Sequence, residues 1–155
     1  MTEDAGLTQN PAGIRILALC SGNSCRSQMV EAWFRALAPE RVEAFSAGVR
    51  PAGFVHPLAI RVMAEAEIDI SSARSKAIDN FLQEPFDYVI TVCAPTAEAC
   101  PVFPGNAVRL HWPLDDPAEA QGDEPSRLEG FRRVRDEVRE RVLMFLNDLA
   151  RSDPA

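Results

Sequence analysis

A cysteine and an arginine six residues apart in a short polar loop form the part of the sequence best suited to chemistry. Cys20 is the first residue of this loop and Arg26 lies near its end. An apolar run at residues 14–19 precedes the loop, and a helical pattern at residues 28–38 follows it. In such a strand–loop–helix context, backbone N–H groups and the helix N-terminus converge on one point. The sequence therefore predicts a pocket for a tetrahedral oxyanion.

The positive field of such a pocket gives each of the two side chains a role. A helix N-terminus and neighbouring cations stabilise a thiolate, so Cys20 is suited to be a nucleophile. Arg26 offers two parallel donors to the oxygens of a bound anion. The alternative is that Cys20 is a small buried residue at a strand end. The Gly22, Asn23 and Arg26 that follow it favour the anion-binding interpretation.

Strands alternate with helices along the chain. The patterns predict strands at residues 14–19, 42–46, 86–92 and 107–111 and helices at residues 28–38, 57–66 and 77–82. A polar connection is expected at residues 68–76 and a loop at residues 112–125. A last helix is expected to begin with a capping box of Ser126 and Glu129. Its apolar stripe consists of Leu128, Phe131, Val134, Val138, Val142, Phe145 and Leu149. The alternation predicts an α/β fold with a parallel sheet and right-handed crossovers.

Length and charge limit the class of protein. A chain of 155 residues suits one domain, which we place at residues 14–150, with a flexible lead-in at residues 1–13 and a tail at residues 151–155. The net charge of −7 and the absence of a basic run disfavour nucleic acid as a partner. The apolar runs are too short to span a bilayer, and the lead-in has no apolar segment of a signal peptide. We therefore expect a cytoplasmic protein and, since no exposed apolar stripe stands out, a monomer.

Two of the four cysteines lie late in the chain, Cys93 at the end of a predicted strand and Cys100 seven residues later. In an unexported chain, catalytic or redox roles are more common than structural disulfides. The spacing is too long for a C-x-x-C motif, and no histidine lies nearby to complete a zinc site, so no metal is expected. The segment between them suits a mobile part of the domain that brings the two sulfurs together. Two unrelated core cysteines are the alternative.

Topology predicts that these separated residues share one site. Ligands of parallel sheets bind beyond the carboxyl ends of the strands. The loop that begins at Cys20, the position of Cys93 and the loop after His111 all lie at such ends.

These motifs resemble those of the low-molecular-weight protein tyrosine phosphatases. The resemblance rests on the C-x5-R-S loop at residues 20–27 and on the Asp116-Pro117 pair. Residues 14–149 as a whole look like the branch of that superfamily that reduces arsenate with help from thioredoxin. The features typical of that branch are residues 25–29, the pair Cys93 and Cys100, His111-Trp112, residues 115–118 and residues 131–137. The resemblance implies a single three-layer α/β domain with a four-stranded parallel sheet, in the order 2-1-3-4, flanked by helices.

The resemblance also implies a three-cysteine relay. Cys20 attacks arsenic, Cys93 attacks the Cys20 adduct and releases arsenite, and Cys100 attacks Cys93 and moves the disulfide outward. Thioredoxin is the expected external reductant and no tightly bound cofactor is implied, although glutaredoxin or a low-mass thiol would also serve. Asp116 is the implied general acid, with Asp115 as its rival. The implied substrate-binding residues are Ser21, Gly22, Asn23, Ser24, Cys25, Arg26 and Ser27.

Support for the loop is implied at a few further positions. By resemblance, Asn23 holds the loop in shape and Ser27 donates to the Cys20 sulfur, although either residue suits a turn or a helix cap. Cys25 has either a structural role or a role in protecting the nucleophile Cys20. Some members of the branch bind potassium through four residues, and Asn23, Glu31 and Ser46 occupy the first three of these positions here. The fourth is Lys76, and we expect its ammonium to replace the metal and to steady Asn23, the alternative being a solvated surface lysine.

Two other functions compete with arsenate reduction. A phosphotyrosine or phosphate monoester phosphatase would use Cys20, Arg26 and Asp116 alone. It would leave Cys93 and Cys100 unexplained, and Ala118-Glu119-Ala120 follow the Asp-Pro pair where such phosphatases carry aromatic residues. Weak phosphatase activity is still expected, since the first half-reaction needs the same geometry. A non-catalytic oxyanion sensor or redox switch is the third class, and it would need no general acid.

Overall fold

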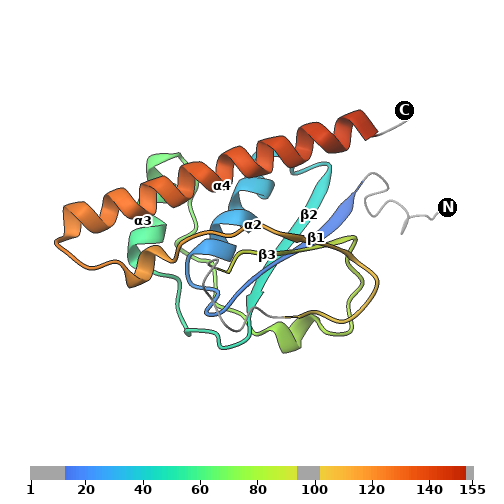
Figure 1. Ribbon diagram of the computed structural model, residues 1–155, viewed down its shortest axis with the longest axis horizontal. Coiled ribbons are helices and arrows are strands. Elements are labelled where there is room, and N and C mark those ends of the chain that lie inside the picture. The colour runs from blue at the N-terminus through green and yellow to red at the C-terminus, as the bar shows by residue number, and fades with distance from the viewer. Residues whose placement is uncertain (1–12, 94–101, 153–155) are drawn as a thin grey trace.

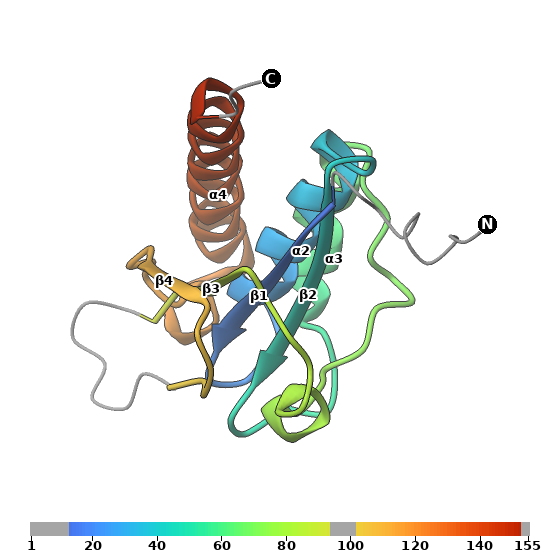
Figure 2. The ribbon, with the colours of Figure 1, turned by 90° about the vertical axis from the view of Figure 1, so that its right-hand side faces the viewer.

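The computed structural model describes residues 13–93 and 102–152. Four strands, β1 (Ile14–Cys20), β2 (Val42–Gly48), β3 (Tyr88–Thr91) and β4 (Val108–His111), form one parallel sheet in the order β2-β1-β3-β4. This confirms the predicted sheet. Figure 2 shows the four strands side by side, with β4 at one edge and β2 at the other. The helices are α2 (Arg26–Leu37), α3 (Pro57–Glu65) and α4 (Glu124–Ser152), with short 3-10 helices η1 (Ile78–Phe81) and η2 (Pro117–Glu119).

The central strand β1 is buried on both faces, which explains its almost unbroken apolar sequence. On one face Ile16 and Ala18 belong to a core that includes side chains of α2, α3 and α4. On the other face Leu17 and Leu19 pack in a smaller core with η1, Val89 and Phe103. Figure 1 shows the long helix α4 running past α2 and α3, against which it packs. No helix in residues 13–93 or 102–152 combines the length and apolar character that crossing a bilayer requires.

The register of the strands brings their carboxyl ends to one edge. Cys20 pairs with Gly48, Leu19 pairs with Thr91, and Thr91 pairs with His111. The loop after β1, the position of Cys93 and the loop after β4 therefore start from the same edge, as the topology predicted.

The capping box predicted for the last helix is wrong. α4 begins at Glu124, two residues before Ser126. The acceptor for the first turn is Asp123, whose Oδ1 receives the N–H of Ser126 at 3.0 Å, while Glu129 pairs with Arg132 at 2.8 Å. Pro125 fits this start, because the first turn of a helix tolerates a residue without an N–H. The predicted apolar stripe does face the core, from Leu128 to Val142.

Other boundaries differ by a few residues. β2 is two residues longer than expected and β3 shorter, and the short helix near residue 80 is a 3-10 helix. The expected loop at residues 112–125 contains η2 and the start of α4. α2 begins at Arg26 rather than at residue 28, so that Arg26 lies in the first helical turn. Most of the lead-in at residues 1–13 lies outside the described residues.

Candidate active site

The loop between β1 and α2 turns its carbonyl groups toward the segment at residues 50–56. The carbonyls of Ser21, Gly22 and Ser24 accept the N–H groups of residues 50, 52 and 56 at 2.8–2.9 Å. In a trans peptide the C=O and N–H point in opposite directions. The N–H groups that follow these carbonyls therefore point away from this segment, and that of Asn23 points to Cys20 Sγ at 3.2 Å.

We call the loop at residues 20–26, with its backbone N–H groups, the cradle. The N-terminus of α2 adds to it. Cys25 is the N-cap residue, and among the described residues its side chain accepts no hydrogen bond from the first helical turn. The first N–H groups of a helix carry partial positive charge and attract an anion when no side chain caps them. The cradle and the helix end thus favour an oxyanion in front of Cys20.

Cys20 is buried at the end of β1 and its sulfur has two polar neighbours. Ser27 Oγ lies 2.8 Å from Sγ, and the backbone N–H of Asn23 donates to Sγ. Asn23 Nδ2 donates to Ser27 Oγ at 2.8 Å, so the hydroxyl proton of Ser27 is free to point at the sulfur. Two hydrogen-bond donors are therefore available to this sulfur.

Arg26 connects the cradle to two other strand ends. Its Nη1 donates to the carbonyls of Val92 and Leu114, both at 3.2 Å, and its Nη2 lies 3.4 Å from Asp116 Oδ2. The residue is only 6% exposed. Asp115 is exposed, whereas the carboxyl of Asp116 faces Arg26, which favours Asp116 as the acid.

Asn23 forms side-chain hydrogen bonds with Ser27, Gln28 and Lys76, of which sequence reasoning considered only Lys76. It has a left-handed backbone with φ of 51°. Its Oδ1 accepts Gln28 Nε2 at 2.9 Å and the backbone N–H of Lys76 at 2.7 Å. Gln28 also donates to the carbonyls of Asn23 and Arg74. Gln28 is 2% exposed, so its amide is buried behind the loop.

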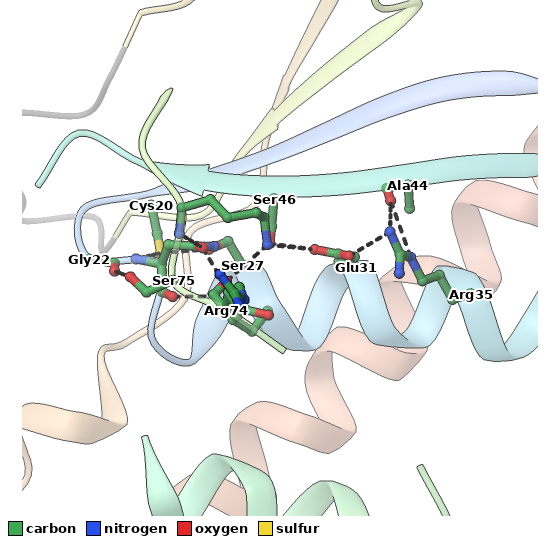
Figure 3. Close-up of polar contacts among 12 residues, drawn as sticks. Cys20, Gly22, Ser27, Glu31, Arg35, Ala44, Ser46, Arg74 and Ser75 are labelled. Carbon is green, nitrogen blue, oxygen red and sulfur yellow. Dashed lines mark hydrogen bonds and ion pairs between the residues drawn. The ribbon is translucent and has the colours of Figure 1, made fainter. Parts of the chain in front are cut away.

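The ammonium of Lys76 lies among oxygen atoms behind the loop. Its Nζ is 3.0 Å from the carbonyl oxygen of Arg74, 3.4 Å from Ser46 Oγ and 3.5 Å from Glu31 Oε1. Figure 3 shows Glu31 between Ser46, which donates to it at 2.5 Å, and Arg35, which pairs with it at 2.8 Å. The contact that we expected between the ammonium and Asn23 is made instead by the backbone N–H of the same residue.

Two further facts about Lys76 bear on an ion at this place. It is the only lysine among the 16 lysine and arginine residues of the chain, a signal for a compact ammonium that the sequence offered. It also borders a solvent-open cavity of about 640 Å³ beside α2. Within residues 13–93 and 102–152, no cluster of three or more His, Cys, Asp or Glu side chains is arranged to hold a metal.

His56 supports the cradle from α3, and sequence reasoning missed it. Its backbone N–H donates to Ser24, while its Nδ1 accepts the N–H of Leu58 at 3.1 Å as the helix cap. Burial and the nearby Arg127 lower the pKa of His56. The ring is therefore uncharged at neutral pH, as an acceptor at Nδ1 requires.

Gly48 lies directly beneath the loop, where no side chain fits. A Cβ atom on Gly48 would meet the carbonyl oxygen of Ser21 at 2.4 Å and the nitrogen of Asn23 at 2.9 Å. Both are backbone atoms, so the cradle itself would have to shift.

Gly48→Ala is expected to lower the rate of the first chemical step about tenfold, because displacement of a positioned group weakens catalysis. It should also cost about 1–3 kcal/mol of stability through overpacking. Gly130→Ala in α4 is the matched control, since its Cβ would have no close contact and alanine favours a helix. Thermal melts and single-turnover rates check both. A Gly48→Ala protein with the wild-type rate would contradict the close-approach argument.

Of the two late cysteines, the structure describes only Cys93. Cys93 is buried two residues after β3 and is disulfide-bonded, whereas Cys20 and Cys25 are free cysteines. Cys100 lies outside the described residues. The structure thus brings Cys25 and Arg26 into contact with Asp116, on the loop that begins at Cys20, and places Cys93 at the end of the strand beside β1.

Known proteins resemble this chain over most of its length. The family described as low molecular weight phosphotyrosine protein phosphatase matches residues 15–155. An arsenate reductase of Halalkalibacterium halodurans is 44% identical over 130 residues, which cover 84% of this chain and 93% of the relative.

Two solved structures share the fold as well. One is described as an arsenate reductase in the phosphate binding state, with a TM-score of 0.72 and 33% identity, covering 87% of this chain and 98% of that one. The other is a thioredoxin-dependent arsenate reductase of Corynebacterium glutamicum, with a TM-score of 0.69 and 28% identity, covering 90% of this chain and 63% of that one.

Proposed function

We propose, since this chain belongs to the low molecular weight phosphotyrosine protein phosphatase family, that it reduces arsenate to arsenite with its own thiols. The relatives named as arsenate reductases support the reaction. The observation that carries the proposal is the state of the cysteines. Cys20 is a free thiol in the oxyanion cradle, while Cys93, at the end of the neighbouring strand, is disulfide-bonded. This is the pattern expected when a disulfide has moved away from the nucleophile.

In the first step, the Cys20 thiolate attacks arsenic and an arsenate hydroxyl leaves as water. Asp116 supplies the proton for the departing oxygen. Arg26 and the cradle N–H groups stabilise the charge on the remaining oxygens. The same geometry serves a phosphate ester, so we also propose a weak phosphatase activity.

In the second step, the Cys93 thiolate attacks the Cys20 sulfur. The S–S bond forms, the S–As bond breaks, and its electron pair remains on arsenic, which leaves as arsenite. The Cys100 thiolate then attacks Cys93 and releases the Cys20 thiolate. Two thiols have become a Cys93–Cys100 disulfide for each arsenate reduced.

An external dithiol must reduce this disulfide, and we propose thioredoxin. The thioredoxin-dependent relative from Corynebacterium glutamicum supports this choice. Thioredoxin keeps thiols reduced in the cytosol, so we propose that the protein is cytoplasmic. We also propose that it is a monomer and that it contributes to arsenic resistance.

The test compares two reactions of the wild-type protein. NADPH consumption with thioredoxin and thioredoxin reductase is measured with arsenate, and phosphate release is measured with an aryl phosphate ester. Arsenate-dependent NADPH consumption that greatly exceeds ester hydrolysis supports the reductase. Ester hydrolysis without arsenate-dependent consumption would favour the phosphatase instead.

For the ammonium of Lys76, we propose that it takes the place of a potassium ion beside Glu31 and Ser46, while the backbone N–H of the same residue supports Asn23. Wild-type rates should therefore be equal in potassium and sodium chloride of the same ionic strength. Lys76→Met removes the charge from among the oxygens of Glu31, Ser46 and Arg74, so it should lower the rate severalfold and make it respond to potassium. Specific stimulation of the wild type by potassium would contradict the proposal.

A readout independent of activity uses the uniqueness of this lysine. Reductive methylation with a ¹³C label gives one side-chain NMR signal in this chain, in addition to any signal from the N-terminus. That signal should not change when potassium replaces sodium.

A further inference from the structure

The thiol of Cys25, for which the relay has no step, lies against the carboxyl group of Asp116. Cys25 is the N-cap residue of α2 and Asp116 is the N-cap residue of η2. Cys25 Sγ is 3.7 Å from Asp116 Oδ1, within the range of a hydrogen bond to sulfur. The backbone N–H of Ala118 donates to the same oxygen at 3.0 Å. Oδ1 therefore has two donors.

The second carboxyl oxygen of Asp116 has a different environment. Oδ2 lies 3.4 Å from Nη2 of Arg26, the residue that opens the anion-binding helix. A carboxyl oxygen has two lone-pair directions for hydrogen bonds. Both directions are used at Oδ1, so a proton on this carboxyl group belongs on Oδ2, on the side of Arg26.

Cys25 is suited to be a donor because it keeps its proton. Burial, followed by the charges of Asp116 and Cys20, raises the pKa of Cys25 to about 12. The side chain is 3% exposed and stays an un-ionised thiol throughout the neutral range. An un-ionised thiol is also a poor nucleophile. This explains why Cys93, and not Cys25, attacks the Cys20 adduct in the proposed relay.

We propose that Cys25 is a positioning residue for the general acid: its thiol and the N–H of Ala118 occupy Oδ1 of Asp116, so that the catalytic proton sits on Oδ2, facing Arg26 and the bound anion. The inference rests on the general-acid role in the proposed function. As the S–As bond forms, the proton moves from Oδ2 to the departing arsenate oxygen, which leaves as water. The carboxylate that remains is stabilised by the same two donors and by Arg26.

The prediction for pH follows from the groups around this carboxyl. Arg26 of α2 and His56 at the start of α3 act on Asp116, and Cys20 acts on Cys25. A hydrogen bond to the carboxylate favours the ionised form. Loss of the Cys25 donor therefore favours the protonated acid, and the fall of the rate at high pH should shift upward.

The experiment measures single-turnover arsenite formation from pH 6 to pH 9, without external reductant, in Cys25→Ala, Cys25→Ser and wild type. In Cys25→Ala the high-pH limb should shift upward, because one donor to the carboxylate is lost. The maximal rate should fall about threefold to tenfold, because the proton is no longer confined to Oδ2. Cys25→Ser keeps a donor and should restore the wild-type limb. A limb in Cys25→Ala that coincides with the wild type, or a serine variant that behaves as alanine, overturns the proposal.

Asp116→Asn separates this inference from the function on which it rests. If that variant forms arsenite at the wild-type rate, the general-acid assignment fails. If it is slow while Cys25→Ala keeps the wild-type profile, only the role of Cys25 fails. Thermal melts of each variant confirm that the comparison is made on folded protein.

Discussion

Replacing Cys100 with serine is expected to change continuous arsenate turnover into a single arsenite per molecule. The first two steps use only Cys20 and Cys93, so one arsenate is still reduced. Without Cys100 the disulfide stays on Cys20, and the nucleophile is not released. Arsenite measured against time, with thioredoxin, thioredoxin reductase and NADPH present, should stop at about one equivalent.

Cys93→Ser is the matched comparison, because it makes the same chemical change one step earlier. It should release no arsenite, since the Cys20 adduct then has no attacking thiol. Peptide mapping of the stalled Cys100→Ser protein should find Cys20 joined to Cys93. Many turnovers in Cys100→Ser would rule out the three-cysteine relay.

Arg26→Lys is expected to lower kcat/KM for arsenate by about 10²–10³-fold, the usual effect of removing a donor that stabilises developing oxyanion charge. Arg26 makes hydrogen bonds to Val92 and Leu114 with one nitrogen while the other faces Asp116. A lysine ammonium is a single point and has no planar fork to do both. The exposed Arg133→Lys is the matched control and should change the rate less than twofold.

Stability must be followed in the same variants, since Arg26 also ties β3 to the loop after β4. The expected result is a modest decrease in melting temperature together with the large kinetic loss. A folded Arg26→Lys protein with kcat/KM within a few-fold of wild type would exclude Arg26 from the anion clamp.

The sequence was most informative where one local pattern determines the structure. The apolar run at residues 14–19 predicted a strand, and the burial of β1 on both faces accounts for that run, because its side chains avoid water in either direction. The cysteine loop was located correctly between β1 and α2 because strand, loop and helix are all local. The start of α4 at Glu124, with Asp123 as the acceptor before it, was missed because Ser126 and Glu129 also fit a cap, and only the path of the chain decides between them.

The parts of the site that could not be predicted depend on contacts between distant segments. Gln28 and the backbone of Lys76 meet at Asn23, although 48 positions separate the first two in the sequence. No local pattern reports a backbone donor. The restriction at Gly48 likewise arises only when β2 lies beside the end of β1. The pair of Cys25 and Asp116, 91 positions apart, depends in the same way on the fold.

The most direct test of thiol-driven arsenate reduction is the arsenite formed per molecule when fully reduced wild-type protein meets excess arsenate with no external reductant. The relay predicts about one arsenite per chain, because each chain holds one pair of relay electrons in Cys93 and Cys100. Cys20 should be recovered as a free thiol afterwards. No arsenite, with all thiols unchanged, would contradict the proposed function.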